Sequence, residues 1–158
     1  MTRINFIPAP RKNPALILRN PIFKSLHRAP MTEDKQQNLA LVSRLAFDTI
    51  QRGKGNVYDR DNLACVVNVC MVLAERHCSP EDLDTILSAQ DGMLRADGRV
   101  LLGKRWNFDA DGRAAMLAAL DIHEQLIAQL GQTAVTEALM EIIARRASGQ
   151  VHRVEVVA

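Results

Sequence analysis

The chain has 158 residues, 47% of them hydrophobic, which is enough for one domain with a core of its own, since such a domain buries roughly 70% of its unfolded surface. Aromatic residues make up only 4%, and the abundance of Leu, Ala, Val and Ile favours packed helices over a sandwich or barrel. The net charge of +2 is too small to make the whole protein a polyanion binder, and no stretch approaches the ~20 apolar residues of a membrane span.

The charges are divided unevenly along the chain. The first thirty residues hold five of the six prolines and no acid, and their six basic residues are Arg3, Arg11, Lys12, Arg19, Lys24 and Arg28. From Met31 onward there are fourteen Lys/Arg against eighteen Asp/Glu. We therefore predict a basic arm over 1–30, a helical domain over 31–150 and a tail over 151–158. This division indicates a binding surface rather than a reaction.

Two helix-start signals lie inside the arm, at Asn13-Pro14 and Asn20-Pro21, where Asn can cap and Pro can occupy the first helical position. The helices that would follow are too short to be stable alone, so they need a surface to lie on. That surface is a partner protein, a second subunit or the protein's own body. The residues that we predict to contact the partner are Arg11, Lys12, Leu16, Arg19, Ile22, Phe23, Lys24, Leu26 and Arg28.

The first long helix is expected from a cap at Thr32 to about Arg52, with acids in the first turn. Its apolar residues recur at spacings of three and four and predict a broad buried face of Leu39, Leu41, Val42, Leu45, Ala46, Phe47 and Ile50.

A second helix, capped by Asp59 or Asp61 and ending near His77, is apolar almost all round and should be the central one. Ser79-Pro80-Glu81-Asp82 is the clearest helix start in the chain. The third helix that follows should carry on one face Leu83, Ile86, Leu87, Gln90 and Leu94.

Asp97-Gly98 is typical of a turn, and we expect a small hairpin or extended loop over 98–108. Asp109 should cap a fourth helix that ends at Gly131, and Thr133 should open a fifth that runs to Arg146. The sequence thus predicts an all-α, compact bundle of about five helices. Its last two helices should point these residues inward: Leu117, Leu120, Ile127, Leu130, Val135, Leu139, Ile142 and Ile143.

Patterns that carry chemistry are weak. The three cysteines, Cys65, Cys70 and Cys78, lie within fourteen residues and lack the paired spacing of a zinc site, so we expect reduced thiols and no metal. Asn107 to Gly112 begins like a calcium loop, but Ala118 stands where the bidentate Glu is required. Asp121, His123 and Glu124 are best explained as solvated polar residues. We predict no catalytic residues, no cofactor and no identifiable small-molecule substrate.

Residues 122–146 partly match a helix-turn-helix, the motif that places its second helix in the DNA major groove. In that interpretation Gln132, Thr133 and Thr136 would meet base edges, and Arg145, Arg146 and Arg153 would meet phosphates. Ile127 and Glu137 depart from the pattern, since a small residue and an apolar residue are usual at those positions.

The leading hypothesis is a non-catalytic interaction or regulatory protein whose arm docks on a partner protein or a second subunit. The first alternative is a nucleic-acid-binding regulator, for which six phosphate contacts predict a slope of log affinity against log salt near about −5. The second is a small enzyme without a recognisable motif. The absence of a secretory signal favours a cytoplasmic location, although the basic leader also fits a transit peptide. Short loops between Ala/Leu-rich helices also occur in bacterial and mobile-element accessory proteins, which assigns no function.

Overall fold

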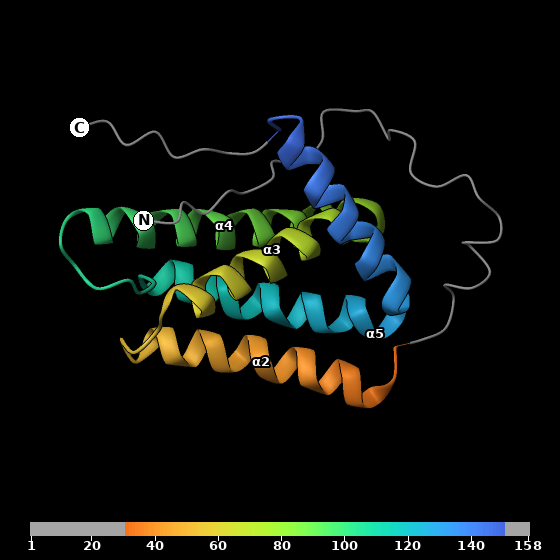
Figure 1. Ribbon diagram of the computed structural model, residues 1–158, viewed down its shortest axis with the longest axis horizontal. Coiled ribbons are helices and arrows are strands. Elements are labelled where there is room, and N and C mark those ends of the chain that lie inside the picture. Colours follow the sequence, from red (N-terminus) through yellow and green to blue (C-terminus); the bar gives the residue numbers. More distant parts are fainter. Residues whose placement is uncertain (1–30, 151–158) are drawn as a thin grey trace.

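The computed structural model describes residues 31–150, so the predicted arm and tail lie outside the described residues. The all-α prediction is confirmed, but this part of the chain has four helices rather than about five. They are α2 (Glu33–Gln51), α3 (Val57–His77), α4 (Pro80–Leu101) and α5 (Ala110–Ala147). Figure 1 shows the first part of α5 running alongside α2, with α4 on the opposite side of the bundle.

Helix α3 is the central element, as its apolar sequence predicts. Every residue from Leu63 to Ala74 is buried except Cys65, and the other three helices all contact α3. The predicted cap was wrong, because α3 begins after Asn56 rather than after Asp59 or Asp61. The Asn56 side chain accepts hydrogen bonds from the Tyr58 and Asp59 backbone N–H groups, and the Asp59 carboxylate accepts one from the Asn56 N–H. Asp59 is therefore the reciprocal partner in a capping box.

The starts of α4 and α5 are where the sequence predicts them. Ser79 Oγ accepts a hydrogen bond from the Asp82 N–H at 3.2 Å, and Pro80 occupies the first helical position. Asp109 caps α5 by accepting from the Gly112 N–H at 2.7 Å. Its carboxylate also accepts from Arg95 Nε at 2.7 Å, and these two contacts lower the pKa of Asp109 to about 2.

The expected hairpin over 98–108 was wrong. Helix α4 continues through Asp97-Gly98 to Leu101, and no strand forms in the loop between α4 and α5. The positive φ of 72° that ends the helix belongs to Gly103 instead. Asp97 accepts a hydrogen bond from Trp106 Nε1 at 2.6 Å, which ties the loop back to α4. The Asp-Gly pair was mistaken for a turn because this tertiary contact cannot be seen in the sequence.

Gly131 interrupts α5, where its φ of 79° and ψ of −179° leave helical geometry. The predicted stop at Gly131 is therefore a bend, and the expected fourth and fifth helices are the two parts of α5 on either side of it. In Figure 1 the last part of α5 turns away from α2 at a steep angle. This backbone conformation is essentially restricted to glycine.

An ion-pair network holds the last part of α5 against α3. Arg145 donates to both carboxylate oxygens of Glu75, at 3.0 and 2.7 Å, and also pairs with Glu141, which pairs in turn with Arg76 of α3. The Arg145 and Glu75 side chains are only 10% and 6% exposed. Hydrogen bonds to Glu75 and Glu141 outweigh the effect of burial and raise the pKa of Arg145. Water is largely excluded here, so the pairing must be complete to be tolerated.

Two further polar contacts set how the helices align. Gln90 of α4 donates to the Asn68 side-chain oxygen of α3 at 3.2 Å inside the core. Arg44 of α2 pairs with Asp121 and Glu124 of α5, so these acids are not the freely solvated residues that the sequence suggested. Buried polar groups tolerate few alternative partners, which makes the α3 and α4 alignment specific.

Helices α4 and α5 cross at a pair of glycines. A Cβ added to Gly92 would lie 2.7 Å from the Gly112 Cα, which is closer than a Cβ atom comes to another heavy atom in real proteins. Both glycines are buried. The absence of a side chain at Gly92 is therefore what permits this close crossing.

We predict that Gly92→Ala destabilises the fold by about 1–3 kcal/mol, because the methyl group meets backbone that cannot rotate away. Gly98→Ala is the matched control in the same helix, where a Cβ meets nothing within 4 Å. It should stabilise α4 by about 0.5–1 kcal/mol through helix propensity. Urea unfolding followed by circular dichroism measures both, and equal effects of the two substitutions would contradict the crossing geometry.

Gly131→Ala should lower the free energy of unfolding by about 1–3 kcal/mol, because alanine is strained at this φ and ψ. The same denaturation experiment applies, again with Gly98→Ala as the reference. A stabilising effect of Gly131→Ala would mean that α5 is not bent at this residue.

Candidate interaction surfaces

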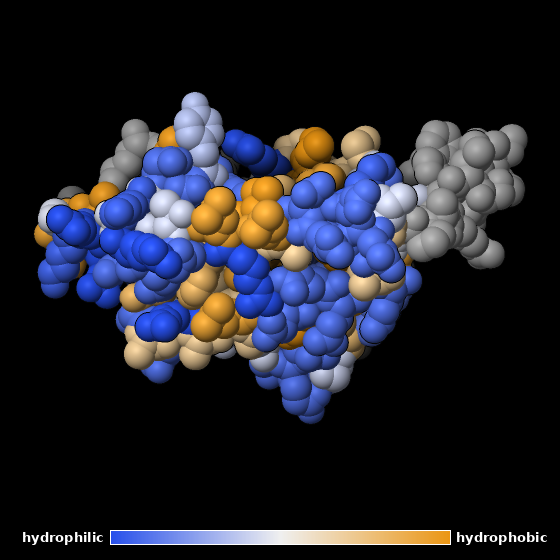
Figure 2. All heavy atoms as spheres, turned by 90° about the horizontal axis from the view of Figure 1, so that it is seen from below, coloured by the Kyte–Doolittle hydropathy of each residue, from blue (hydrophilic) through white to orange (hydrophobic). Residues whose placement is uncertain are grey.

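Helix α2 carries large apolar side chains on two faces, and only one of them is buried. The inward face consists of Ser43, Phe47 and Ile50, with Ala46 beside them. The opposite side, which we call the α2 outer face, carries Leu41 and Leu45, exposed by 64% and 60%, with Val42, exposed by 53%, at its edge. Leu39, exposed by 40%, lies one turn before Ser43 at the start of the inward row. Figure 2, seen from the side on which α2 lies, shows hydrophobic side chains near the middle of this face and hydrophilic ones on either side.

The prediction that these α2 outer-face residues are buried was wrong. The apolar pattern of α2 spans more of the helix circumference than α3 and α5 can cover. Periodicity identifies an apolar face but does not say how many neighbours the helix has. The sequence signal that could have separated the two faces is the spacing within them, since Leu41 and Leu45 form one row and Ser43, Phe47 and Ile50 form another.

A second exposed apolar surface lies on the last part of α5. Met140 and Ile143 are 58% and 62% exposed, and Leu139 is 37% exposed. The prediction that Leu139 and Ile143 point inward was therefore wrong, while Val135 and Ile142 are partly buried against the core. Ala138 and Arg145 occupy the inward positions of this segment instead.

The described residues that were predicted to contact DNA all lie on the part of α5 after the bend at Gly131, but in different surroundings. Gln132 is exposed and accepts a hydrogen bond from Lys35 of α2 at 3.0 Å, and the Thr136 hydroxyl donates to the Gln132 backbone oxygen. Thr133 is half-buried and Arg146 is exposed. Arg145 is buried in its ion pairs with Glu75 and Glu141, so a phosphate contact at that residue would require breaking them.

The predicted partner-binding residues of the arm, from Arg11 to Arg28, lie outside the described residues, as does Arg153.

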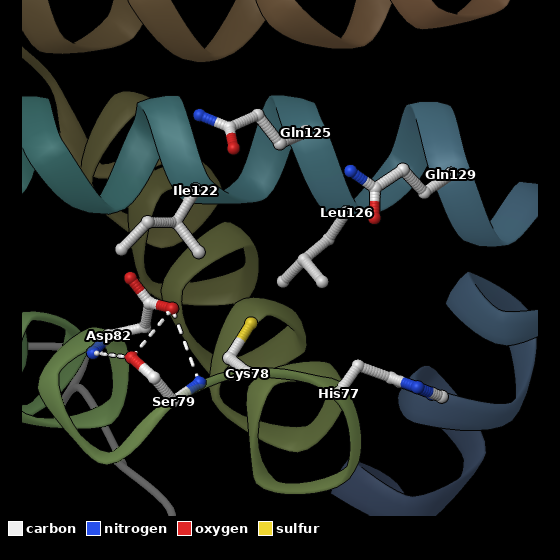
Figure 3. Close-up of a pocket in the computed structure, with 8 residues that line it drawn as sticks. All are labelled: His77, Cys78, Ser79, Asp82, Ile122, Gln125, Leu126 and Gln129. Carbon is white, nitrogen blue, oxygen red and sulfur yellow. Dashed lines mark hydrogen bonds between the residues drawn. The ribbon is translucent and has the colours of Figure 1, made fainter.

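A shallow depression lies between the α3–α4 junction and α5 (Figure 3). Its volume is about 200 Å³, below the roughly 300–1,000 Å³ of typical ligand pockets. It is lined by His77, Cys78, Ser79, Asp82, Ile122, Gln125, Leu126 and Gln129.

The chemistry of this depression does not match a nucleophilic site. In Figure 3 the Cys78 sulfur points toward Ile122 and Leu126, whereas the His77 ring points away from it. Burial, with a smaller contribution from Asp82, raises the pKa of Cys78, which opposes formation of the reactive thiolate. The Asp82 carboxylate already accepts hydrogen bonds from Ser79 in the helix cap.

The remaining candidate groups have structural explanations. Cys65, Cys70 and Cys78 are all unpaired thiols, and burial raises the pKa of the Cys70 thiol. Within residues 31–150 no cluster of three or more His, Cys, Asp or Glu is arranged to hold a metal ion. None of the helices in that range combines the length and the apolar character needed to cross a bilayer.

His123 is a further correction, because it is buried rather than solvated. It lies on α5 at 4% exposure, and its Nδ1 atom is buried without a hydrogen-bond partner. Burial lowers the pKa of His123 to about 4, with only a small opposing effect from Glu124. The imidazole is therefore neutral at physiological pH and acts as a core residue.

No protein-family model, no curated protein and no solved structure matches this chain. The geometry of the described residues is thus the basis for any functional assignment.

We predict that the fold loses stability as the pH falls from about 6.5 toward 4. The unfolded chain protonates His123 near 6.5 while the folded protein resists protonation until about pH 4, so the unfolded state binds more protons in this range. The loss should reach roughly 3 kcal/mol.

Urea unfolding at several pH values, compared with His123→Leu, measures this contribution. His77→Gln, at an exposed position, is the control for removing a histidine. If His123→Leu leaves the pH dependence of the free energy of unfolding unchanged, His123 is not the group responsible.

Proposed function

We propose that this is a non-catalytic interaction protein, in which the helical body binds another protein surface through the α2 outer face. The observation that carries the proposal is the exposure of Leu41, Val42 and Leu45, each more than half accessible to solvent, above a core that is already closed beneath them. The basic arm is proposed as a second docking segment, on the strength of its composition alone.

Exposed apolar side chains that lie next to one another indicate a surface that binds a partner. Leu41 and Leu45 are one helical turn apart, and Val42 lies beside them. Removing apolar surface from water yields roughly 25 cal/mol per Å². Contiguous apolar patches on soluble proteins usually mark interaction sites, whereas scattered single residues need no explanation.

The neighbourhood of the α2 outer face also suits docking. Arg44, on the flank of this face, is held by Asp121 and Glu124 of α5, so α2 is anchored to the body at its middle. An anchored helix loses little conformational entropy when a partner binds, which favours affinity.

The alternatives have less support from the described residues. The depression near Cys78 is small, and the raised pKa of that thiol opposes nucleophilic chemistry. The nucleic-acid hypothesis rests on the basic arm, which lies outside the described residues, and in part on the helix-turn-helix interpretation, in which Arg145 is committed to Glu75 and Glu141. The acidic excess from Met31 onward also repels phosphates.

The test is affinity capture from native cell extract with the full-length chain and with Leu41→Lys/Leu45→Lys. Lysine at both positions should reduce recovery of the specific partner at least tenfold, because a charge cannot be buried unpaired in an apolar contact. Leu102→Lys is the matched control, since Leu102 is 75% exposed in the loop after α4. Thermal unfolding should change little in either variant, because the replaced side chains are exposed.

Equal capture by the wild type and the α2 variant, from a chain that is itself monomeric, would contradict the proposal. Binding to a nucleic-acid pool with a log–log salt slope near about −5 would support the nucleic-acid alternative instead.

A further inference from the structure

Along the side of α2 that carries Leu41 and Leu45, six residues follow one another at alternating spacings of four and three. This is the seam spacing of a coiled coil, in which every position of the row faces a partner helix. Each of the six is exposed to solvent or half-buried in the described structure. The row, which we call the α2 seam, consists of Asp34, Asn38, Leu41, Leu45, Asp48 and Arg52.

The α2 seam is complementary to a second copy of itself that runs in the opposite direction. When a second α2 is laid antiparallel with a two-fold axis at the level of Ser43, Leu41 of one copy faces Leu45 of the other. In the same register Asp34 faces Arg52, and Asn38 faces Asp48. Apolar residues thus meet at the centre, while opposite charges and an amide–carboxylate pair meet toward the ends.

A parallel arrangement of the same seam is unfavourable. It would place Asp34 against Asp34, Asp48 against Asp48 and Arg52 against Arg52, and like charges facing each other destabilise an interface. The charge order along α2 therefore selects both the partner and its direction.

The groups that would form the interface are available to do so. Arg52 pairs with Asp48 at 2.8 Å, but both side chains are at least half exposed, so this local pair can rearrange at little cost. Val42 flanks the seam on one side, and Arg44 on the other is already bound to α5. An isologous contact of this kind closes as a dimer and cannot propagate into a filament.

We propose that the protein forms a homodimer through antiparallel pairing of the α2 seam with a second copy of the chain. This inference rests on the proposed function, and it names the partner of the α2 outer face. A second copy is the occupant that the charge order favours, because the arm carries no acidic residue to face Arg52.

The experiment is sedimentation equilibrium on the purified full-length chain from about 1 to about 200 µM, a range that brackets micromolar dimers. The wild type should show a concentration-dependent dimer. Asp34→Arg alone and Arg52→Asp alone should each weaken dimerisation roughly tenfold, because each creates two like-charge contacts across the axis. The double variant Asp34→Arg/Arg52→Asp should recover the wild-type dissociation constant within about threefold.

Asp84→Arg, an exposed charge reversal on α4, is the control and should leave dimerisation unchanged. Circular dichroism of each variant shows whether a lost dimer reflects a lost fold, and the double variant guards against this because it restores binding without restoring either residue.

The outcomes separate this inference from the proposed function. A chain that stays monomeric but loses a captured protein in Leu41→Lys/Leu45→Lys would overturn the dimer and leave the proposed function standing. A monomer with no such loss would overturn both. The antiparallel seam would be overturned if the single charge reversals left the dimer dissociation constant unchanged. It would also be overturned if the double variant failed to recover the wild-type dissociation constant.

Discussion

Helix α3 is apolar on almost every side, and the rest of the structure is arranged to keep it out of water. From Leu63 to Ala74 only Cys65 is exposed, so neighbours are needed around the whole circumference of that stretch. A straight helix of the length of α5, 38 residues, would extend about 57 Å and pass well beyond the roughly 32 Å of α3. The bend at Gly131 returns the last part of α5 to α3 instead.

The polar groups inside the molecule fix the positions of the other helices against α3. Arg145 reaches back to Glu75 of α3, and the pair is nearly buried, so the last part of α5 has one position in which its charges are compensated. Gln90 and Asn68 do the same for α4 against α3 with a neutral hydrogen bond. Apolar packing among aliphatic side chains alone would tolerate sliding, whereas these contacts do not.

Helix α2 lies at the edge of this arrangement, with one face on α3 and α5 and the other toward solvent. Its inner side is anchored by Phe47 and Ile50 in the core and by the Arg44 ion pairs to α5. The outer side carries a second row of apolar side chains, and these side chains do not take part in the core. Because these apolar side chains remain exposed, the functional proposal rests on the surface of α2 rather than on a cavity. The depression near Cys78 is too small, and its thiol too weakly acidic, to compete with it.

Much of the local structure was determined by the sequence alone. The caps at Ser79 and Asp109 act through side chains within three residues, and the all-round apolar pattern of α3 requires burial whatever surrounds it. The break at Gly131 could also be located, because glycine alone readily adopts that backbone conformation.

Only the tertiary structure decided which surfaces stay open. The burial of His123, the Asp97–Trp106 contact that replaces a turn, and the exposure of Leu41, Leu45 and Ile143 depend on partners far away in the chain. Periodicity reports that a face is apolar, but the number and direction of neighbouring helices decide whether water is removed from it. Too few helices pack on α2 to cover both of its apolar faces, and the uncovered face is the candidate site.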